Sequence, residues 1–254
     1  MPTLQHISLA TPSQQFPLFL RLSHLEALMR VRAITAFAII VFLGWCPSSH
    51  AAIVGTTGAI VVVSSPSNVR LGFLESNTSI LAFAEQSNKT LANDLAVNIS
   101  APSTVPNGSS INLTPGTIPA GTHVDSWLLH FDPVGTPQLA LALSGSITFD
   151  RPVLGIEVLS TSLDNTDGLL GASGSEYTLR DPLKGLELAV GMAGINTFDG
   201  ITLSADRKTV TTILSTQLNF DQVRIITAVP EPSSFAMLIV GGLSLLACCR
   251  RRWN

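Results

Sequence analysis

The sequence is poor in charge, in aromatic residues and in cysteine. Only 12% of its 254 residues are charged, and the formal net charge is −3. That balance excludes a strongly basic nucleic-acid-binding protein. The three cysteines, at positions 46, 248 and 249, are too few for a scaffold built on disulfides. The mean hydropathy of +0.41 is high for a cytosolic enzyme. The composition therefore predicts an exported or membrane-tethered protein with no nucleic-acid partner.

The first of two apolar segments, residues 33–45, follows the basic stretch Met29–Arg32 and precedes the small residues Ser49 and Ala51. This order of basic, apolar and small residues is typical of a secretory signal peptide, with cleavage between Ala51 and Ala52. Thirteen apolar residues rise only about 20 Å as a helix, which is too short to span the hydrocarbon core of a bilayer. The N-terminal segment is therefore predicted to be a cleavable leader.

The second apolar segment, residues 233–249, has a proline-rich box before it and a cluster of arginines after it. The box consists of Val229, Pro230, Glu231 and Pro232, and the cluster of Arg250, Arg251 and Arg252. Seventeen residues rise about 25 Å as a helix, enough to cross a locally thinned bilayer. Arginines resist translocation, so they act as a membrane stop on the cytoplasmic side. The prolines cannot continue the helix, and they favour an extended segment that a protease can bind.

A Pro-Glu-Pro box, an apolar helix and a terminal arginine cluster in this order resemble the PEP-CTERM sorting domain of bacterial proteins. The resemblance covers residues 229–252, about a tenth of the chain, and Cys248 and Cys249 depart from the pattern. It implies that an exosortase, a membrane enzyme, recognises and cleaves the tail near the box. It also implies a precursor anchored in the inner membrane and a product at the cell surface or in the extracellular matrix.

These signals divide the chain into four parts. Signal peptides begin at the initiator methionine, so we interpret the residues before Met29 as an over-predicted extension of the reading frame, with a long leader as the alternative. The parts are the extension 1–28, the signal peptide 29–51, the exported domain 52–228 and the sorting signal 229–254. The exported domain contains fifteen acidic and eight basic residues, a net charge of −7, and no cysteine.

The exported domain has the pattern of an all-β protein. Runs of strand length rich in β-branched residues, or alternating polar and apolar residues, recur along it; they lie at 59–63, 126–131, 146–150, 153–159, 210–214 and 223–227. Turn signals such as Pro106-Asn-Gly108 and Asp199-Gly200 separate them. Leu91–Val97 is the best candidate for a short helix. Strands without alternating helices predict a single, jelly-roll-like β-sandwich.

Two sets of residues are candidates for metal or acid–base chemistry. His123 and Asp125, and then His130 and Asp132, fall on opposite faces of one regular strand, so the four groups are not expected to converge. Asp164, Asn165 and Asp167, followed by Gly168, resemble part of a calcium loop. An EF-hand needs a glutamate at position 12, where this chain has Ser175. An unliganded turn is therefore the preferred interpretation, with structural calcium as the alternative and no other cofactor expected.

We predict from these features a non-enzymatic structural or interaction protein of the bacterial cell envelope or extracellular matrix. Its partners are expected to be an exosortase and, through the C-terminal helix, the membrane. The alternative is a carbohydrate-binding module acting on exopolysaccharide. The domain's single tryptophan, Trp127, and single tyrosine, Tyr177, argue against that alternative, because sugar-binding faces usually present several aromatic rings. A secreted hydrolase is the least favoured interpretation, because no acid–base pair is recognisable.

Overall fold

The computed structural model describes residues 50–106, 112–135, 137, 139–186, 199–216 and 219–229. They belong to the second of the chain's two units, Ser48–Asn254. Most of the leader and all of the predicted 233–249 helix lie outside these residues. Within the described part of the chain, no helix is both long and apolar enough to cross a membrane.

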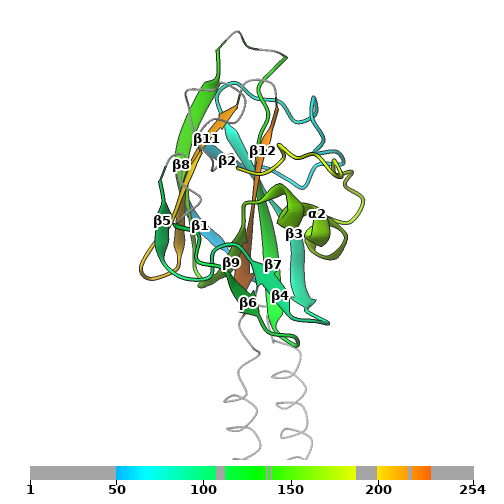
Figure 1. Ribbon diagram of the computed structural model, residues 1–254, viewed down its shortest axis with the longest axis vertical. Helices are drawn as coiled ribbons and strands as arrows, with labels where there is room; N and C mark the ends of the chain where they lie inside the picture. Colours follow the sequence, from blue (N-terminus) through cyan, green and yellow to red (C-terminus); the bar gives the residue numbers. More distant parts are fainter. Residues whose placement is uncertain are drawn as a thin grey trace, which may run out of the picture. The chain divides into compact units, whose positions relative to one another are not determined.

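The described residues form an all-β domain with strands in two five-stranded sheets and one small ribbon (Figure 1). Sheet A has the order β1-β8-β11-β10-β5, sheet B the order β2-β3-β7-β12-β9, and β4 pairs with β6. The strands are β1 (Ile53–Gly58), β2 (Ile60–Val62), β3 (Ile80–Thr90), β4 (Leu95–Val97), β5 (Ser103–Val105), β6 (Gly116–Ile118), β7 (His123–Phe131), β8 (Leu141–Phe149), β9 (Val153–Glu157), β10 (Gly200–Leu203), β11 (Thr209–Thr216) and β12 (Asp221–Ala228). The prediction of an all-β domain is confirmed.

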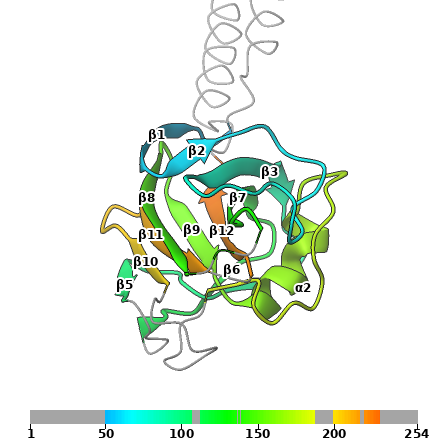
Figure 2. The same cartoon turned by 90° about the horizontal axis from the view of Figure 1, so that it is seen from above.

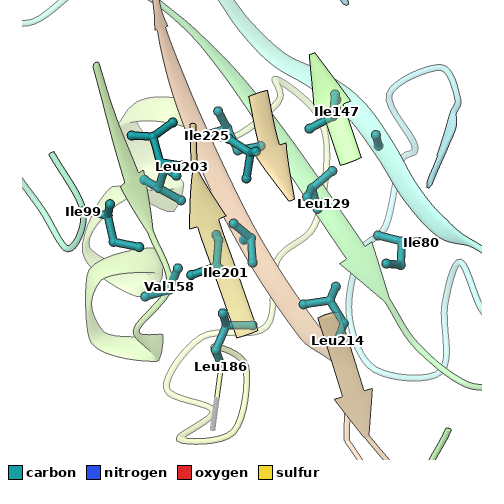
Figure 3. Packing of buried hydrophobic residues seen from close by; sticks show 14 of the residues in the cluster. Ile80, Ile99, Leu129, Ile147, Val158, Leu186, Ile201, Leu203, Leu214 and Ile225 are labelled. Atoms are coloured by element: carbon teal, nitrogen blue, oxygen red, sulfur yellow. The ribbon is translucent and has the colours of Figure 1, made fainter. Parts of the chain in front are cut away.

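The two sheets share one core of buried aliphatic and aromatic side chains (Figure 3). Because side chains alternate along a strand, one face of each sheet supplies this core. Sheet B contributes residues such as Leu129 and Ile225, and sheet A contributes Ile147, Ile201 and Leu214; these side chains are at most 1% exposed. The pairing is antiparallel except for β2, which runs parallel to β3.

The chain passes from sheet A to sheet B immediately after β1. Only Ala59 separates β1 from β2, and Gly58 lies in the left-handed region with a φ of 66°. A Cβ atom at Gly58 would lie 2.3 Å from the carbonyl oxygen of Ser144. Glycine is therefore required both for the turn and for the close approach to β8.

The second face of sheet B is covered by helix α2 (Ser160–Leu170), as both views of the domain show (Figures 1 and 2). Leu163 packs against Phe83 and Leu128, and Leu170 joins a neighbouring cluster that includes Val124. Both leucines are fully buried, and burying a side chain of this size contributes about 1.5–3 kcal/mol. Tertiary packing therefore holds this helix in place.

Two local predictions from the sequence are wrong. Leu91–Val97 does not form a helix: its last three residues are strand β4, which pairs with β6. The segment containing Asp164, Asn165 and Asp167 is not a turn but the middle of α2. Leu159 caps that helix without a side-chain hydrogen bond, and its serine, threonine and glycine residues have low helix propensity. The sequence therefore carries no local helix signal there.

Candidate functional site

The densest group of charged side chains lies between sheet B and α2. It comprises Arg224 on β12, Glu85 on β3, Glu157 on β9, Asp167 on α2 and Lys184 in the loop after α2. We call it the buried charge cluster. Arg224, Lys184 and Glu157 are 0% exposed, and Glu85 and Asp167 are 8% exposed. Charges at such depth persist only when they are paired and hydrogen-bonded.

Arg224 is the hub of the buried charge cluster. Its Nε and Nη2 donate to the two carboxylate oxygens of Glu85, at 2.7 and 2.8 Å. Nη2 also donates to Asp167 Oδ1 at 2.9 Å, and Nη1 donates to Thr166 Oγ1 at 2.6 Å. A guanidinium group has five donors in a fixed planar fork. These four acceptors come from β3 and α2, so Arg224, which lies on β12, joins the helix to the sheet.

Lys184 occupies the position that the sequence suggested for calcium. Its ammonium donates to Asp164 Oδ1 at 3.0 Å, to Asp167 Oδ2, and to the carbonyl of Thr178 at 3.0 Å. The carboxylates of Asp164 and Asp167 thus already have a cation of the protein between them. Asn165 instead lines a surface pocket of about 390 Å³, together with Thr161, Asp164, Leu179 and Arg180.

Burial controls the protonation of the buried charge cluster. Burial raises the pKa of Glu157 to about 7, against the opposing effects of Arg224 and the Thr166 hydroxyl. Among the described residues, Glu157 Oε1 has no hydrogen-bond partner. Burial alone lowers the pKa of Arg224, but the neighbouring carboxylates, Glu85 foremost, outweigh it and hold the pKa above its ordinary value. Arg224 therefore stays charged while Glu157 titrates near neutrality.

Tyr177 closes the cluster on the helix side. Its hydroxyl donates to Glu85 Oε1 at 2.9 Å and accepts from the backbone N–H of Ala172 at 2.8 Å. Burial and the charge of Glu85 raise the pKa of the phenol, so Tyr177 remains a neutral donor. The arrangement fixes the helix and the loop after it on the sheet. With its groups buried and bonded to one another, its chemistry is that of a structural ion network.

The two histidine–aspartate pairs lie apart, with His130 and Asp132 at the C-terminal end of β7, where Asp132 directly follows the strand. His130 is buried; its Nε2 lies 3.3 Å from the carbonyl oxygen of Phe73, and its Nδ1 3.1 Å from Gln222 Nε2. Burial lowers the pKa of His130 to about 4, which keeps the ring neutral. Asp132 accepts from Gly72 N–H at 2.7 Å. Burial raises the pKa of Asp132 to about 6.

His123 and Asp125 lie at the other end of β7. The ring of His123 contacts Asn88 Oδ1 at 2.8 Å, while Asp125 accepts from Asn88 N–H at 2.6 Å. Within the described ranges, no group of three or more histidine, cysteine, aspartate or glutamate side chains is arranged to hold a metal ion.

Both ends of the described domain meet near Asp125. Ala51 N–H donates to Asp125 Oδ2 at 2.5 Å, and Thr227 pairs with Asp125 in the β7–β12 ladder. Val229 N–H donates to the carbonyl of His123 at 3.2 Å. The predicted cleavage point Ala51–Ala52 and the start of the predicted sorting motif thus lie at one end of sheet B. Pro230, Glu231, Pro232, Arg250, Arg251 and Arg252 lie outside the described residues.

Sequence reasoning missed the buried charge cluster, although one signal for it was present. Arg224 interrupts the otherwise apolar run Val223–Ile226 in a predicted strand, and a charge within such a run indicates a buried partner. Its carboxylate partner Glu85 lies 139 residues away, so no local pattern could identify it.

No family model matches the chain, and no curated protein or solved structure matches it either.

Proposed function

We propose that this chain is an exported, non-enzymatic protein of the bacterial cell envelope or extracellular matrix. In this proposal the leader is removed after Ala51, and the tail resembling a PEP-CTERM signal holds the precursor in the inner membrane. An exosortase then cleaves near Val229–Pro232, and the domain remains at the cell surface or enters the matrix. The domain itself serves a structural or interaction role. Its fold in this proposal is a jelly-roll-like sandwich, which is supported by the alternation of the successive strands β7, β8 and β9 between the two sheets.

The observation that carries this proposal is the meeting of the two chain ends. Ala51, at the leader side, contacts Asp125 of β7, and Val229, at the start of the sorting motif, contacts His123, two positions away on the same strand. A domain attached to a membrane through both ends needs its ends on the same side. The box also follows β12 without a linker, because Val229 is still hydrogen-bonded to the sheet and Pro230 is the next residue.

The test is the intact mass of the surface protein recovered from a host that produces an exosortase. We expect the wild-type protein at the surface to lack every residue after the Val229–Pro232 box. Changing Pro230 and Pro232 together to alanine lets the helix extend through the box, so the uncleaved form should accumulate in the inner membrane. Replacing Arg250, Arg251 and Arg252 by serine removes the membrane stop, so the precursor should escape uncleaved.

The control for these variants is Pro119→Ala, which changes a proline in an exposed loop far along the chain from the box. That variant should be processed as the wild type is. Intact-mass spectrometry of the surface protein decides the matter. If most of the wild-type protein still carries Trp253 and Asn254 in an exosortase-positive host, the tail is only an anchor and the sorting proposal is wrong.

A second candidate, a carbohydrate-binding module for exopolysaccharide, is favoured by the outer face of sheet A. Hydroxyl side chains stand in register across all five strands of that sheet. They are Thr57, Ser146, Thr211, Thr202 and Thr104. None of the five strands contains a charged residue. This hydroxyl row would bind a neutral sugar chain through hydrogen bonds alone. Binding of the exported protein to its host's exopolysaccharide, abolished by Thr211→Lys, would support this candidate.

A further inference from the structure

Two consecutive backbone N–H groups at the predicted leader junction point at two carboxylates. Ala51 N–H donates to Asp125 Oδ2 at 2.5 Å, and Ala52 N–H donates to Asp150 Oδ1 at 2.8 Å. Asp125 belongs to β7 of sheet B, and Asp150 directly follows β8 of sheet A. The two sheets thus each supply one aspartate to the place where the chain enters the domain.

Asp125 would lose partners when the leader is removed. Its side chain is 1% exposed, and it accepts from Asn88 N–H at 2.6 Å. Its nearest ionisable partner in the described residues is His50, at 3.7 Å, and His50 lies on the leader side of the junction. Leader removal takes away both His50 and the Ala51 N–H. Of the partners that the structure describes, only the Asn88 N–H then remains, and a carboxylate at this depth is costly without a compensating charge.

Hydrolysis of the Ala51–Ala52 peptide bond supplies such a charge. Water breaks the C–N bond, and its oxygen stays on Ala51 as a carboxylate that departs with the leader. The nitrogen of Ala52 takes up protons and becomes an α-ammonium group, with three donors and a positive charge in place of one neutral N–H. At neutral pH an α-amino group of this kind is mostly protonated.

We propose that Asp150 and Asp125 form a binding site for the α-ammonium group that leader removal creates on Ala52. Asp150 is already in direct contact with that nitrogen. Asp125 contacts the preceding residue, and consecutive Cα atoms are only about 3.8 Å apart, so it is the second carboxylate beside the new charge. This inference rests on the proposed export and leader removal.

Such a site would make β1 dependent on processing. β1 is an edge strand that pairs with β8, and Ala52 lies one residue before it. With the leader attached, Ala52 offers a neutral amide, so an ion pair between the sheets forms only after cleavage. The processed domain then has its first strand fixed at both ends: by the ammonium site at one end and by the Gly58 turn at the other.

The experiment uses the processed protein recovered from the exporting host. Intact-mass analysis and N-terminal sequencing identify its first residue, which should be Ala52. Acylation of the α-amine with an amine-reactive ester, followed by peptide mass spectrometry, then measures how strongly the site protects the ammonium. Only the neutral amine reacts, so a nearby carboxylate slows labelling. We expect Asp150→Asn to label about three- to ten-fold faster than the wild type.

Two further variants separate binding from folding. Asp206→Asn changes an aspartate in an exposed turn, and it should label at the wild-type rate. Asp150→Glu keeps the charge and should restore most of the protection. If Asp150→Asn labels at the wild-type rate, or the processed chain starts at a residue other than Ala52, the ammonium site is wrong while export still stands. A protein that keeps its leader would instead overturn the proposed function, and this inference with it.

Discussion

The outer faces of the two sheets both carry polar side chains, but one face is covered by a helix and the other is open to solvent. The outer face of sheet B carries Arg224, Glu85 and Glu157 and is covered by α2, so its polar groups must bond to one another. The outer face of sheet A carries the hydroxyl row and is open, with Thr211 exposed to solvent. Ser146 and Thr211 bond across the strands at 2.7 Å, but water can replace that bond. A polar side chain is therefore critical on the covered face and replaceable on the open one.

The largest effect is expected from removing the hub of the covered face. Arg224→Met leaves the Glu85 carboxylate buried without its cation and removes one of the two cations beside Asp167. Breaking a buried ion pair from one side costs about 3–5 kcal/mol. We expect the free energy of unfolding, measured in urea, to fall by that amount. Arg70→Met is the control, because Arg70 pairs with Glu176 on the surface, with side chains 47% and 60% exposed; its cost should be about 0–1 kcal/mol. Equal losses of stability in the two variants would mean that the buried ion pairs of the covered face contribute no more than an exposed ion pair.

The next effect is a pH dependence of stability that arises from Glu157 on the covered face. Burial raises the pKa of Glu157 from 4.5 to about 7, so the folded state binds a proton more tightly than the unfolded state. The resulting stabilisation is fully present below pH 4.5 and is lost as the pH rises through about 7. Glu157→Gln keeps the shape without the charge, so relative to the wild type it should gain about 3 kcal/mol between pH 4.5 and 8. Urea titrations across that range measure this difference, and a difference that stays constant with pH would contradict the prediction.

The smallest effect is expected from two threonine variants, one from each face, whose free energies of unfolding are compared. Thr166 donates to the Glu157 carboxylate and accepts from Arg224, so Thr166→Val should lower the free energy of unfolding by about 1–3 kcal/mol. Thr211→Val on the hydroxyl row should change it by less than about 0.5 kcal/mol. Thermal unfolding of the two variants side by side provides the measurement. A large loss at Thr211 would mean that the hydroxyl row holds sheet A together.

The β-rich nature of the domain was predictable because most strands carry their signal locally. β9, β11 and β12 are rich in β-branched residues, and each was predicted close to its observed position. β3 was missed although it is eleven residues long. Its core-facing positions include Ala82 and Ala84, and its second half is polar, so neither β-branched composition nor period-two alternation marks it.

The candidate site was less predictable because its determinants are distant in sequence. α2 depends on contacts with sheet B rather than on capping or propensity. Asp125 was singled out from the sequence as a possible metal or acid–base residue, yet its partner is the backbone of Ala51, 74 residues earlier. Local patterns identify which residues have useful chemistry, whereas the fold decides which of them meet.

The position of β12 also determines how the domain responds to mechanical load. β12 lies between β7 and β9; it pairs with β7 along its whole length and with β9 from Arg224 to Thr227. A tail fixed in a membrane would pull on Val229 along the axis of this strand. The ladders on both sides would then be loaded in shear, with many bonds sharing the force, rather than opened one bond at a time. Resistance to such pulling is governed by the unfolding rate, so a strand held on both sides is a strong point of attachment for a tethered domain.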